Sequence, residues 1–370
     1  ILTGFPWNLI AYSFSNNLEI IQVISLIGTY AFNILCISIF LSPAIFILRE
    51  SRKEIAVCIF LLLSPIIIYM SGSSKIKSFQ SLNVIKNDQI IRAVGSKVDL
   101  SRFYENTDTV SVIDELIELS KPDLETKTLF LWPEGIIPNI NQSEFKEFET
   151  LFNKRFNEKH ILGIGINSYE NKLYNSFSFY DHNLNLVNAY NKVNLVPFGE
   201  FLPFEKILSK LGLKKITPGY SSFSPGDKRD VINLGEQFSK KSILPLICYE
   251  IIYPAKIKKK EQYPDLVINI SEDAWFGKSI GPYQHFAKAI YRSVEEGVFI
   301  ARSANKGISA LINPNGKILK SLNTGESGNI EYKFPHFSKK TLFSKYGNKI
   351  FFLIIFLYIF LTLIFKKFKI

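Results

Sequence analysis

The sequence predicts a mixed α/β protein, with a large domain of layered strands and helices flanked by membrane-spanning helices. Two observations lead to this fold class. Short apolar runs alternate with helical patterns between residues 72 and 346, which is typical of strands and helices packed in layers. Long apolar stretches lie on both sides of that region, at a length typical of helices in a lipid bilayer.

Three apolar stretches are predicted to span the membrane: Leu26–Leu48, Ile55–Met70 and Ile350–Phe365. The last two are shorter than the roughly 20 residues of a typical span, but the basic residues beside them can extend to the lipid surface. A core helix is the alternative for these two, and it would show a polar face that neither has. The predicted membrane regions are therefore 1–71 and 347–370.

Basic residues predict how these spans are oriented. The loop Arg49–Lys53 and the tail Lys366–Lys369 concentrate positive charge, which favours the cytoplasmic side. Region 72–346 then lies on the opposite side, in the periplasm of a cell with an inner and an outer membrane. The chain opens on Ile1 with no charged segment or cleavage site, so we expect it to be the middle of a longer protein with further spans upstream.

Region 72–346 is predicted to begin with a Ser/Lys-rich linker at 71–78. Apolar runs bounded by turn residues predict its strands. These runs are SLNVI (81–85), TLFLW (128–132), ILGIGI (161–166), NSFSFY (175–180), SILPLI (242–247), DLVINI (265–270), ISALI (308–312) and NIEYKF (329–334). Between them, helices are predicted at Thr109–Ser120, Glu144–Asn157 and about Gln284–Arg302.

Charge and cysteine usage exclude several classes of protein. The net charge is +11, yet no basic helix with interleaved aromatic residues is present, so nucleic-acid binding is not predicted. Anionic lipid headgroups are the more natural partner of this charge. Cys36 and Cys58 lie in apolar stretches far from Cys248, so neither a disulfide framework nor a metal site is predicted. We expect no metal and no cofactor.

Chemistry is predicted at the ends of three strand-like runs. Glu134 follows Pro133, which ends the hydrogen-bonding ladder and leaves the carboxylate at the end of the sheet. Lys192 lies among apolar residues that would desolvate its ammonium group. Cys248 lies between an apolar run and the polar pair Tyr249 and Glu250. The three are candidates for general base, oxyanion donor and nucleophile of an acyl transfer.

Each of these residues also has a structural interpretation. Taken alone, Glu134 could be a solvated turn residue, Lys192 could extend from an edge strand, and Cys248 could be a buried thiol. Glu200, eight residues after Lys192, either pairs with that lysine or makes a turn, and the spacing does not decide between these.

Longer strings around these residues resemble the apolipoprotein N-acyltransferases, membrane enzymes whose extracytoplasmic domain belongs to the nitrilase, or carbon-nitrogen hydrolase, superfamily. The resemblance covers almost the whole chain. The strings are GFPW (4–7), WPEG (132–135), YNKVNLVPFGEFLP (190–203), ICYE (247–250), SEDAWFGKSIGPYQHF (271–286) and RSANKGISALINPNG (302–316).

The resemblance implies an αββα sandwich and a two-step reaction in a multi-pass protein of the inner membrane. An acyl chain passes from a phospholipid to Cys248 as a thioester, and then to the α-amine of the diacylglyceryl cysteine of an apolipoprotein. Glu134 would be the base and Lys192 the oxyanion donor. The residues implied to support the site are Glu200, Tyr249 and Glu250. The aromatic residues expected to contact acyl chains, unless they are ordinary core, are Phe103, Trp132, Trp275 and Phe276.

The sequence departs from the family pattern at three positions. Glu272 replaces the asparagine of the usual SNDAWFG string, Lys306 replaces a second asparagine, and Phe103 stands where a tryptophan is common. We expect the extra carboxylate of Glu272 to perturb the charge balance of the site. The alternative function is a membrane-tethered amidase that uses the same three residues and water. A binding or scaffolding protein with a degenerate site is a third alternative, and the presence of all three catalytic residue types argues against it.

Overall fold

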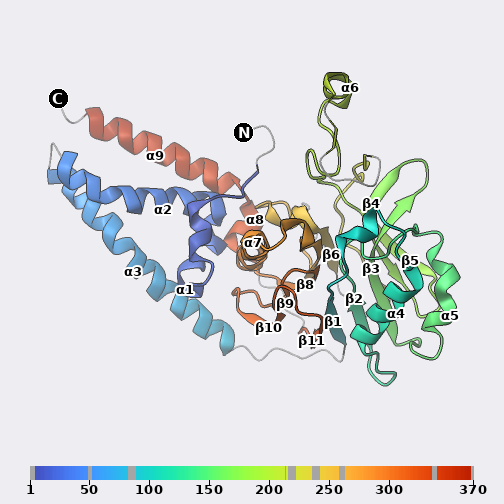
Figure 1. Ribbon diagram of the computed structural model, residues 1–370. Coiled ribbons are helices and arrows are strands. Elements are labelled where there is room, and N and C mark those ends of the chain that lie inside the picture. The colour runs from blue at the N-terminus through green and yellow to red at the C-terminus, as the bar shows by residue number, and fades with distance from the viewer. Residues whose placement is uncertain are drawn as a thin grey trace.

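The computed structural model describes residues 5–48, 52–81, 89–212, 214–215, 222–235, 242–257, 263–335 and 340–367. The predicted basic loop residues 49–51, the end of the basic tail at 368–370 and most of the predicted strand at 81–85 lie outside these ranges. Figure 1 shows helices α2, α3 and α9 extending together from one side of a domain of strands and helices.

Two sheets form the centre of the domain. In the first, the strands run in the order β11-β1-β2-β3-β4-β5, and in the second β10-β9-β8-β7-β6. The first sheet comprises β1 (Ile90–Gly95), β2 (Thr128–Leu131), β3 (His160–Tyr169), β4 (Leu173–Tyr180), β5 (Leu186–Asn191) and β11 (Gly328–Tyr332). The second comprises β6 (Ile243–Ile247), β7 (Leu266–Glu272), β8 (Phe299–Asn305), β9 (Ser309–Ile312) and β10 (Ile318–Leu322).

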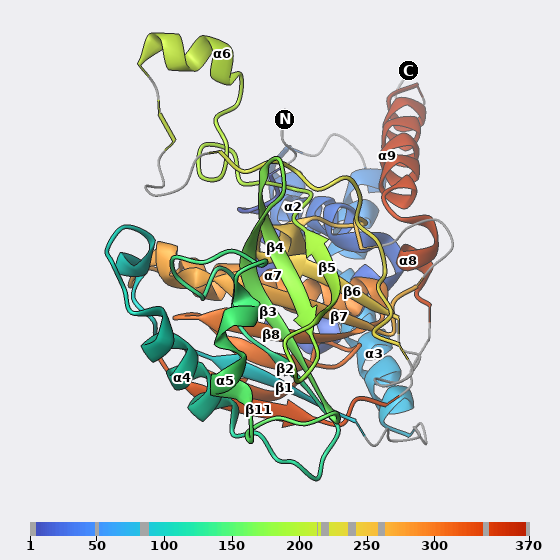
Figure 2. The same ribbon diagram turned by 90° about the vertical axis from the view of Figure 1, so that its right-hand side faces the viewer.

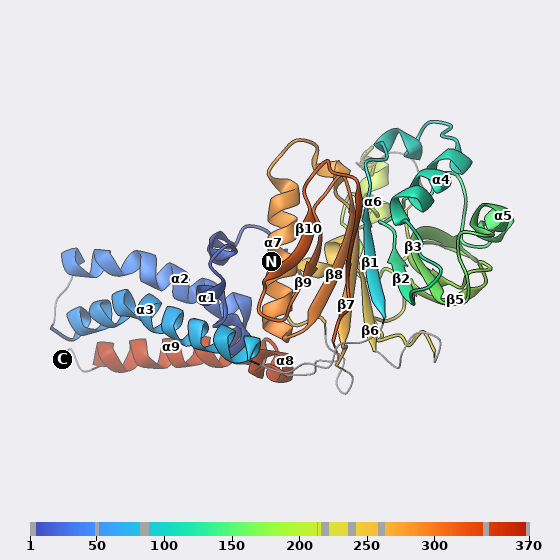
Figure 3. The ribbon, with the colours of Figure 1, turned by 90° about the horizontal axis from the view of Figure 1, so that it is seen from below.

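The two sheets face each other, and helices cover their outer faces, which gives the predicted αββα sandwich (Figure 3). Apolar side chains of β1, β2 and β3 pack against those of β6, β7 and β8 between the sheets. Helix α4 (Thr109–Ser120) and the short helix α5 (Glu149–Phe152) cover the first sheet. Helix α7 (Gly281–Glu296) covers the second, as the turned view in Figure 2 also shows. The central strands of each sheet are therefore buried on both faces.

Parallel pairing brings the catalytic strings to one edge. Strands β1, β2 and β3 run parallel to each other, as do β6, β7 and β8. Because parallel strands end at the same edge of a sheet, the residues after β2, β6 and β7 lie close together. The topology therefore makes one site from segments more than a hundred residues apart in sequence.

Several predicted boundaries were wrong. The helix predicted to reach Arg302 ends at Glu296, because Gly297 adopts a left-handed conformation (φ 67°), and strand β8 follows. The helix predicted at Glu144–Asn157 is two short pieces, η3 (Phe145–Phe148) and α5. Strands β1, β5 and β10 were not predicted. Strands β5 and β10 are largely exposed, and their sequences show weak apolar patterns.

Helices α2 (Ile24–Leu48) and α3 (Arg52–Gln80) are, among the described residues, long and apolar enough to cross a membrane, and the apolar part of α9 (Lys349–Lys367) is shorter. Only 22% of the most apolar window of α2 and 17% of that of α3 is buried. A core helix would be mostly buried, so this exposure favours contact with lipid.

The residues 71–78, predicted to form a linker, instead continue α3 to Gln80. Helix α3 packs closely here on α1 (Leu18–Ile21), because Gly72 has no side chain and the backbone of Glu19 occupies the space a Cβ atom would need. Lys75 Nζ also donates a hydrogen bond of 2.6 Å to Ser25 Oγ. These contacts hold the helix together beyond its apolar part.

Helix α2 joins the apolar helices to the domain. It bends at Gly28, whose φ of 79° is outside the helical range, and the ring of Phe343 from α8 (Leu342–Tyr346) lies against this glycine. Beside the bend, Thr29 donates hydrogen bonds to Glu295 of α7 from both its backbone and its hydroxyl group. The bend thus anchors α2 to the helix that covers the second sheet.

Candidate active site

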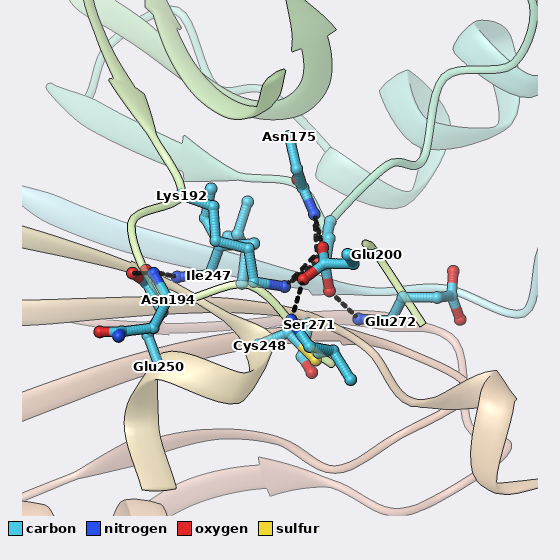
Figure 4. A network of polar contacts seen from close by, with 12 residues as sticks. Asn175, Lys192, Asn194, Glu200, Ile247, Cys248, Glu250, Ser271 and Glu272 are labelled. Atoms are coloured by element: carbon cyan, nitrogen blue, oxygen red, sulfur yellow. Dashed lines mark hydrogen bonds and ion pairs between the residues drawn. The ribbon is translucent and has the colours of Figure 1, made fainter. Parts of the chain in front are cut away.

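A buried lysine lies at the centre of the candidate site. Lys192 directly follows β5, and its Nζ is 3.0 Å from Glu134 Oε1 and 2.9 Å from Glu200 Oε1. Asn175 Nδ2 of β4 donates to the same two oxygens at 2.7 Å. Figure 4 shows Lys192, Asn175 and Glu200 pointing toward one another beside Cys248. Glu200 Oε2 also accepts a hydrogen bond of 2.7 Å from the backbone N–H of Val196, so the structure shows both interpretations that the sequence left open, the pair with Lys192 and the turn.

Glu134 is held by the loop that follows β2. Its second oxygen, Oε2, accepts a hydrogen bond of 2.9 Å from the backbone N–H of Glu272. The loop passes very close to β3, where a Cβ atom on Gly165 would lie 2.3 Å from the carbonyl oxygen of Pro133. Only glycine allows this approach, so the position of Glu134 depends on Gly165 as well as on Pro133.

Cys248 occupies the first residue after β6 and begins the short 3₁₀ helix η6 (Cys248–Ile252). Its φ of 46° lies in the left-handed region, which is strained for a residue with a side chain. The backbone carbonyl of Cys248 lies 3.2 Å from Nε2 of His285, a residue of α7. Asp273 and Arg302 hold His285 in place, with Asp273 Oδ1 2.9 Å from Nδ1 of the imidazole. A buried polar network therefore supports the strained turn.

Glu250 is fully buried beneath the same turn. Its carboxylate accepts hydrogen bonds from the backbone N–H groups of Ile247, Val193 and Asn194, at 2.9 to 3.1 Å. Tyr190 also donates to it at 2.8 Å, and Arg229 forms an ion pair at 3.0 Å. The residue links the cysteine turn to the segment after Lys192, so it fixes the distance between these two strings.

The charge states of the three central groups follow from their surroundings. Burial opposes charge on Glu134, yet the pKa of Glu134 is lowered because Lys192 and Asn175 favour the carboxylate. Burial also opposes charge on Lys192, but Glu134 and Glu200 raise its pKa well above the ordinary value. The pKa of Cys248 is raised well above its ordinary value by burial and by the charge of Glu134. At neutral pH the site holds a carboxylate, an ammonium group and a neutral thiol.

Glu272, the departure from the family pattern, has a cationic partner. It forms a buried ion pair with Arg102 and accepts hydrogen bonds of 3.0 Å from Asn305 Nδ2. Arg102 also donates to the carbonyl oxygen of Gly135, directly after Glu134. The extra negative charge is therefore balanced locally, and the pair braces the loop that carries Glu134. Lys306, the other departure, forms an ion pair of 2.6 Å with Asp99 outside the cavity lining.

The Glu272→Gln variant is expected to flatten the dependence of stability on pH. Burial raises the pKa of Glu272 from 4.5 to about 7 despite Arg102. The folded protein thus binds this proton more tightly than the unfolded chain, so the stabilising contribution is complete below pH 4.5 and is lost as pH rises to about 7. Its size is roughly 3 kcal/mol. Unfolding measured between pH 4 and 8 tests this.

Glu170→Gln, at an exposed glutamate, is the matched control and should keep the wild-type pH dependence. Parallel curves for the wild type and Glu272→Gln would contradict the prediction.

An apolar cavity of about 310 Å³ opens onto Glu134, Lys192 and Cys248. Its walls are mainly apolar, and Phe103 and Trp275 stack there with ring centroids 5.4 Å apart. The other aromatic residues of the lining are Phe5, Trp7, Phe223, Tyr249 and Phe276. The shape and the apolar walls suit a hydrocarbon chain better than a small polar amide.

Trp132 does not belong to this lining, contrary to the expectation that it contacts acyl chains. Its side chain is fully buried in the core between the first sheet and helices α4 and α5. Its indole N–H donates to Ser120 Oγ at 2.9 Å, which satisfies the polar end of the ring inside the core. Strand alternation explains this, because the side chain of Trp132 points to the helix-covered face of the sheet.

Three residues of the site were not predicted from the sequence: Asn175, Arg102 and His285. Asn175 belongs to the predicted strand NSFSFY, where a polar residue on a buried strand is a signal in itself. His285 lies in the string SEDAWFGKSIGPYQHF, whose polar residues at Asp273 and His285 meet at one point in the fold. Arg102 has no comparable signal, since it lies in a short 3₁₀ helix between elements.

Comparisons with known proteins agree with this geometry. The family described as "Carbon-nitrogen hydrolase" matches residues 94–334, and the "Apolipoprotein N-acyltransferase N-terminal domain" matches residues 1–66. The apolipoprotein N-acyltransferase of Rickettsia prowazekii is 35% identical over 365 residues, covering 94% of this chain and 69% of that protein. The protein of the same name from Bradyrhizobium diazoefficiens is 29% identical over 361 residues, covering 94% and 67%.

Two solved structures match part of this chain at low sequence identity. Nit3 of Saccharomyces cerevisiae, a member of the nitrilase superfamily, matches 69% of this chain and 92% of its own, with 17% identity and a TM-score of 0.48. An amidase from Nesterenkonia matches 69% of this chain and 94% of its own, with 16% identity and a TM-score of 0.47.

Proposed function

Since this chain belongs to the apolipoprotein N-acyltransferase family, with a carbon-nitrogen hydrolase domain, we propose that it N-acylates apolipoproteins through a thioester on Cys248. The observation that supports the assignment of residues is the position of Lys192. This ammonium group bridges the carboxylates of Glu134 and Glu200 at the base of the cavity that Cys248 also lines.

In the first step, the neutral thiol of Cys248 attacks an ester carbonyl of a phospholipid. The thiol gives its proton to Glu134 as the new bond forms, because its raised pKa prevents it from ionising beforehand. The oxyanion that develops is stabilised by Lys192 and by the backbone amide that follows Cys248, a role worth about 2.7 to 4 kcal/mol per donor. When the C–O bond breaks, Glu134 returns the proton to the departing oxygen, and a lysophospholipid leaves.

In the second step, the α-amine of the diacylglyceryl cysteine of an apolipoprotein attacks the thioester. Glu134 accepts a proton from the amine as the C–N bond forms, and the sulfur leaves and is protonated again. The amide product and the free thiol close the cycle. Water would hydrolyse the thioester, so the apolar aromatic walls of the cavity have a protective role.

The membrane supplies the phospholipid, which is the first substrate, and anchors the diacylglyceryl group of the apolipoprotein, which is the second. We place α2, α3 and α9 across the bilayer, so that the protein crosses it several times and the strand domain lies on the periplasmic side of the inner membrane. We place the catalytic domain between Gln80, where α3 ends, and Leu342, where α8 begins, whereas the sequence predicted boundaries at 72 and 346. Phe204, Ile207 and Leu211, around the protruding helix α6 (Glu205–Leu208), are strongly exposed and suit contact with lipid.

A membrane-tethered amidase is the second candidate, because carbon-nitrogen hydrolases share the sandwich fold. An acyl-transfer assay separates the two functions, with labelled phospholipid as donor and a diacylglyceryl lipopeptide as acceptor. Transfer of label to the lipopeptide supports the proposed function. Hydrolysis of small amides without such transfer would contradict it.

The Glu134→Gln variant is expected to slow thioester formation by about 10² to 10⁴-fold, the usual contribution of a general base. The amide keeps the size of the side chain, and its oxygen can keep the hydrogen bond from the backbone of Glu272, but its NH2 group then no longer accepts from Lys192 and Asn175. Single-turnover loading of Cys248, followed by intact-mass spectrometry, measures this rate. The control is Glu144→Gln, a change of the same kind in a glutamate outside the cavity lining, which should load normally. Normal loading of Glu134→Gln itself would reject this residue as the base.

A further inference from the structure

A second cavity, of about 460 Å³, lies at the opposite end of α7 from the active site. His285, in the first turns of α7, lines the active-site cavity, whereas Gly297, just after the C-terminus of α7, lines the second one. The remaining wall comes from the start of α2, the end of α3, the turn at Pro314 and the residues that begin α8. The cavity therefore lies where the membrane helices meet the domain.

The wall contributed by α3 carries apolar residues first and a lysine further along the helix. Ile67 and Ile68 are followed by Ser71, Lys75 and Ser78, and Phe79 ends the series with an apolar ring. At about 1.5 Å per residue, Lys75 lies roughly 11 Å along the helix from Ile68. This is the order of groups that a phospholipid presents, with a hydrocarbon chain below a phosphate.

Charge in this cavity has one sign. Lys75 lines it from α3 and Lys340 from the segment before α8, and no acidic side chain is among the described residues that line it. Lys75 Nζ also donates to Ser25 Oγ, so its ammonium group is directed at this wall. Two cations above an apolar floor favour an anionic amphiphile over a neutral one.

Two buried amides point to a polar ligand. Gln22 and Asn315 both line the cavity and are only 2% and 4% exposed. Gln22 Oε1 and Asn315 Nδ2 have no hydrogen-bond partner among the described residues. The Nε2 group of Gln22 donates to the carbonyl oxygens of Leu18 and Asn315, which fixes the orientation of the amide. A buried acceptor and a buried donor are thus available to a molecule in the cavity, and leaving both without a partner is unfavourable.

We propose that this cavity binds one anionic phospholipid at a site separate from the active site. The phosphate contacts Lys75 and Lys340, the glycerol and ester region reaches Gln22 and Asn315, and an acyl chain runs along Ile67. The proposal depends on the membrane placement proposed above but not on the acyl-transfer reaction. The bound lipid fills the junction between α3 and the domain, so it is a structural ligand and not a substrate.

Native mass spectrometry of the protein released from nanodiscs tests this site. The nanodiscs contain either phosphatidylglycerol or phosphatidylcholine, and both the wild type and Cys248→Ala are measured. We expect each protein to retain one phosphatidylglycerol and to retain phosphatidylcholine far less. Retention by Cys248→Ala separates the site from the reaction, because that variant cannot form the thioester.

The two lysines are tested with Lys75→Gln, Lys340→Gln and the double variant. Retention is expected to weaken roughly fivefold for each lysine and about 25-fold for both. Lys340 is exposed, so Lys340→Gln tests the site even if Lys75→Gln disturbs the packing of α3. The control is Lys320→Gln, at an exposed lysine of β10, which should retain lipid as the wild type does.

Unchanged retention in the double variant would overturn the site. Equal retention of phosphatidylglycerol and phosphatidylcholine would overturn its selectivity for an anionic headgroup. Inorganic phosphate, added at the concentration of the lipid, should not displace the phosphatidylglycerol. Full displacement would mean that the cavity binds free phosphate, which would overturn the assignment to a lipid.

Discussion

The Cys248→Ser variant is expected to lose acyl transfer by about 10⁴-fold or more, the scale at which removal of a catalytic nucleophile acts. The hydroxyl group is a poorer nucleophile than the thiol, and the ester that it forms acylates an amine less readily than a thioester does. The change removes little volume, and the backbone at position 248 already adopts its strained conformation through the network around His285. Intact-mass spectrometry after incubation with phospholipid measures the outcome.

Two other free cysteines provide the matched controls for this experiment. Cys36 and Cys58 are buried in the helical region and have no part in the proposed chemistry. Cys36→Ala and Cys58→Ala should still gain the mass of one acyl chain, and neutral hydroxylamine should remove it. An acyl adduct that persists in Cys248→Ser and resists hydroxylamine would identify an oxygen ester. Transfer at the wild-type rate in that variant would refute the assignment of the nucleophile.

The Lys192→Met variant is expected to abolish turnover and also to destabilise the protein. Methionine keeps the length of the side chain but removes a cation that the buried Glu134 and the partly buried Glu200 share. Breaking a buried ion pair by removing one partner costs about 3 to 5 kcal/mol, because the remaining charge has no counterion. Loss of the oxyanion donor alone lowers the rate by about 10² to 10³-fold. Thermal unfolding and the acyl-transfer assay measure the two effects separately.

A double variant distinguishes the structural role of Lys192 from its chemical role. Lys192→Met combined with Glu200→Gln removes one of the two negative charges, so much of the lost stability should return. Activity should stay absent, since the ammonium group that stabilises the oxyanion is gone. Recovery of both stability and activity would mean that Lys192 only balances charge.

The sequence predicted the layered fold well, and it failed where local pattern competes with tertiary structure. The helix at Thr109–Ser120 was predicted with its observed bounds, because it has an aspartate cap and an apolar face. The pattern after Gln284 continued past Gly297, and only the left-handed conformation of that glycine reveals where the helix ends and β8 begins. The end of α3 was missed because its polar residues form a helix through contacts with α1 and α2.

For the site, sequence strings indicated which residues to bring together but not how they are held. The convergence of Glu134, Lys192 and Cys248 on one cavity follows from strand endings. The ion pair between Arg102 and Glu272 joins residues 170 positions apart and had no signal in either segment. Trp132 was assigned to the wrong environment, because a residue next to a catalytic string can belong to either face of its strand.

Helix α9, through which the chain leaves its domain, contacts α2, and α2 in turn packs on α3, through which the chain enters. Tyr30 of α2 and Phe351 of α9 have ring centroids 5.7 Å apart, and the hydroxyl oxygens of Ser38 and Tyr358 lie 3.2 Å apart. A domain connected through helices that pack together cannot rotate as freely as a domain on a single flexible linker. If these helices lie in the bilayer, the distance between the Cys248 thiol and the lipid surface is fixed. We therefore expect the depth of an ester along the glycerol to decide which acyl chain is transferred.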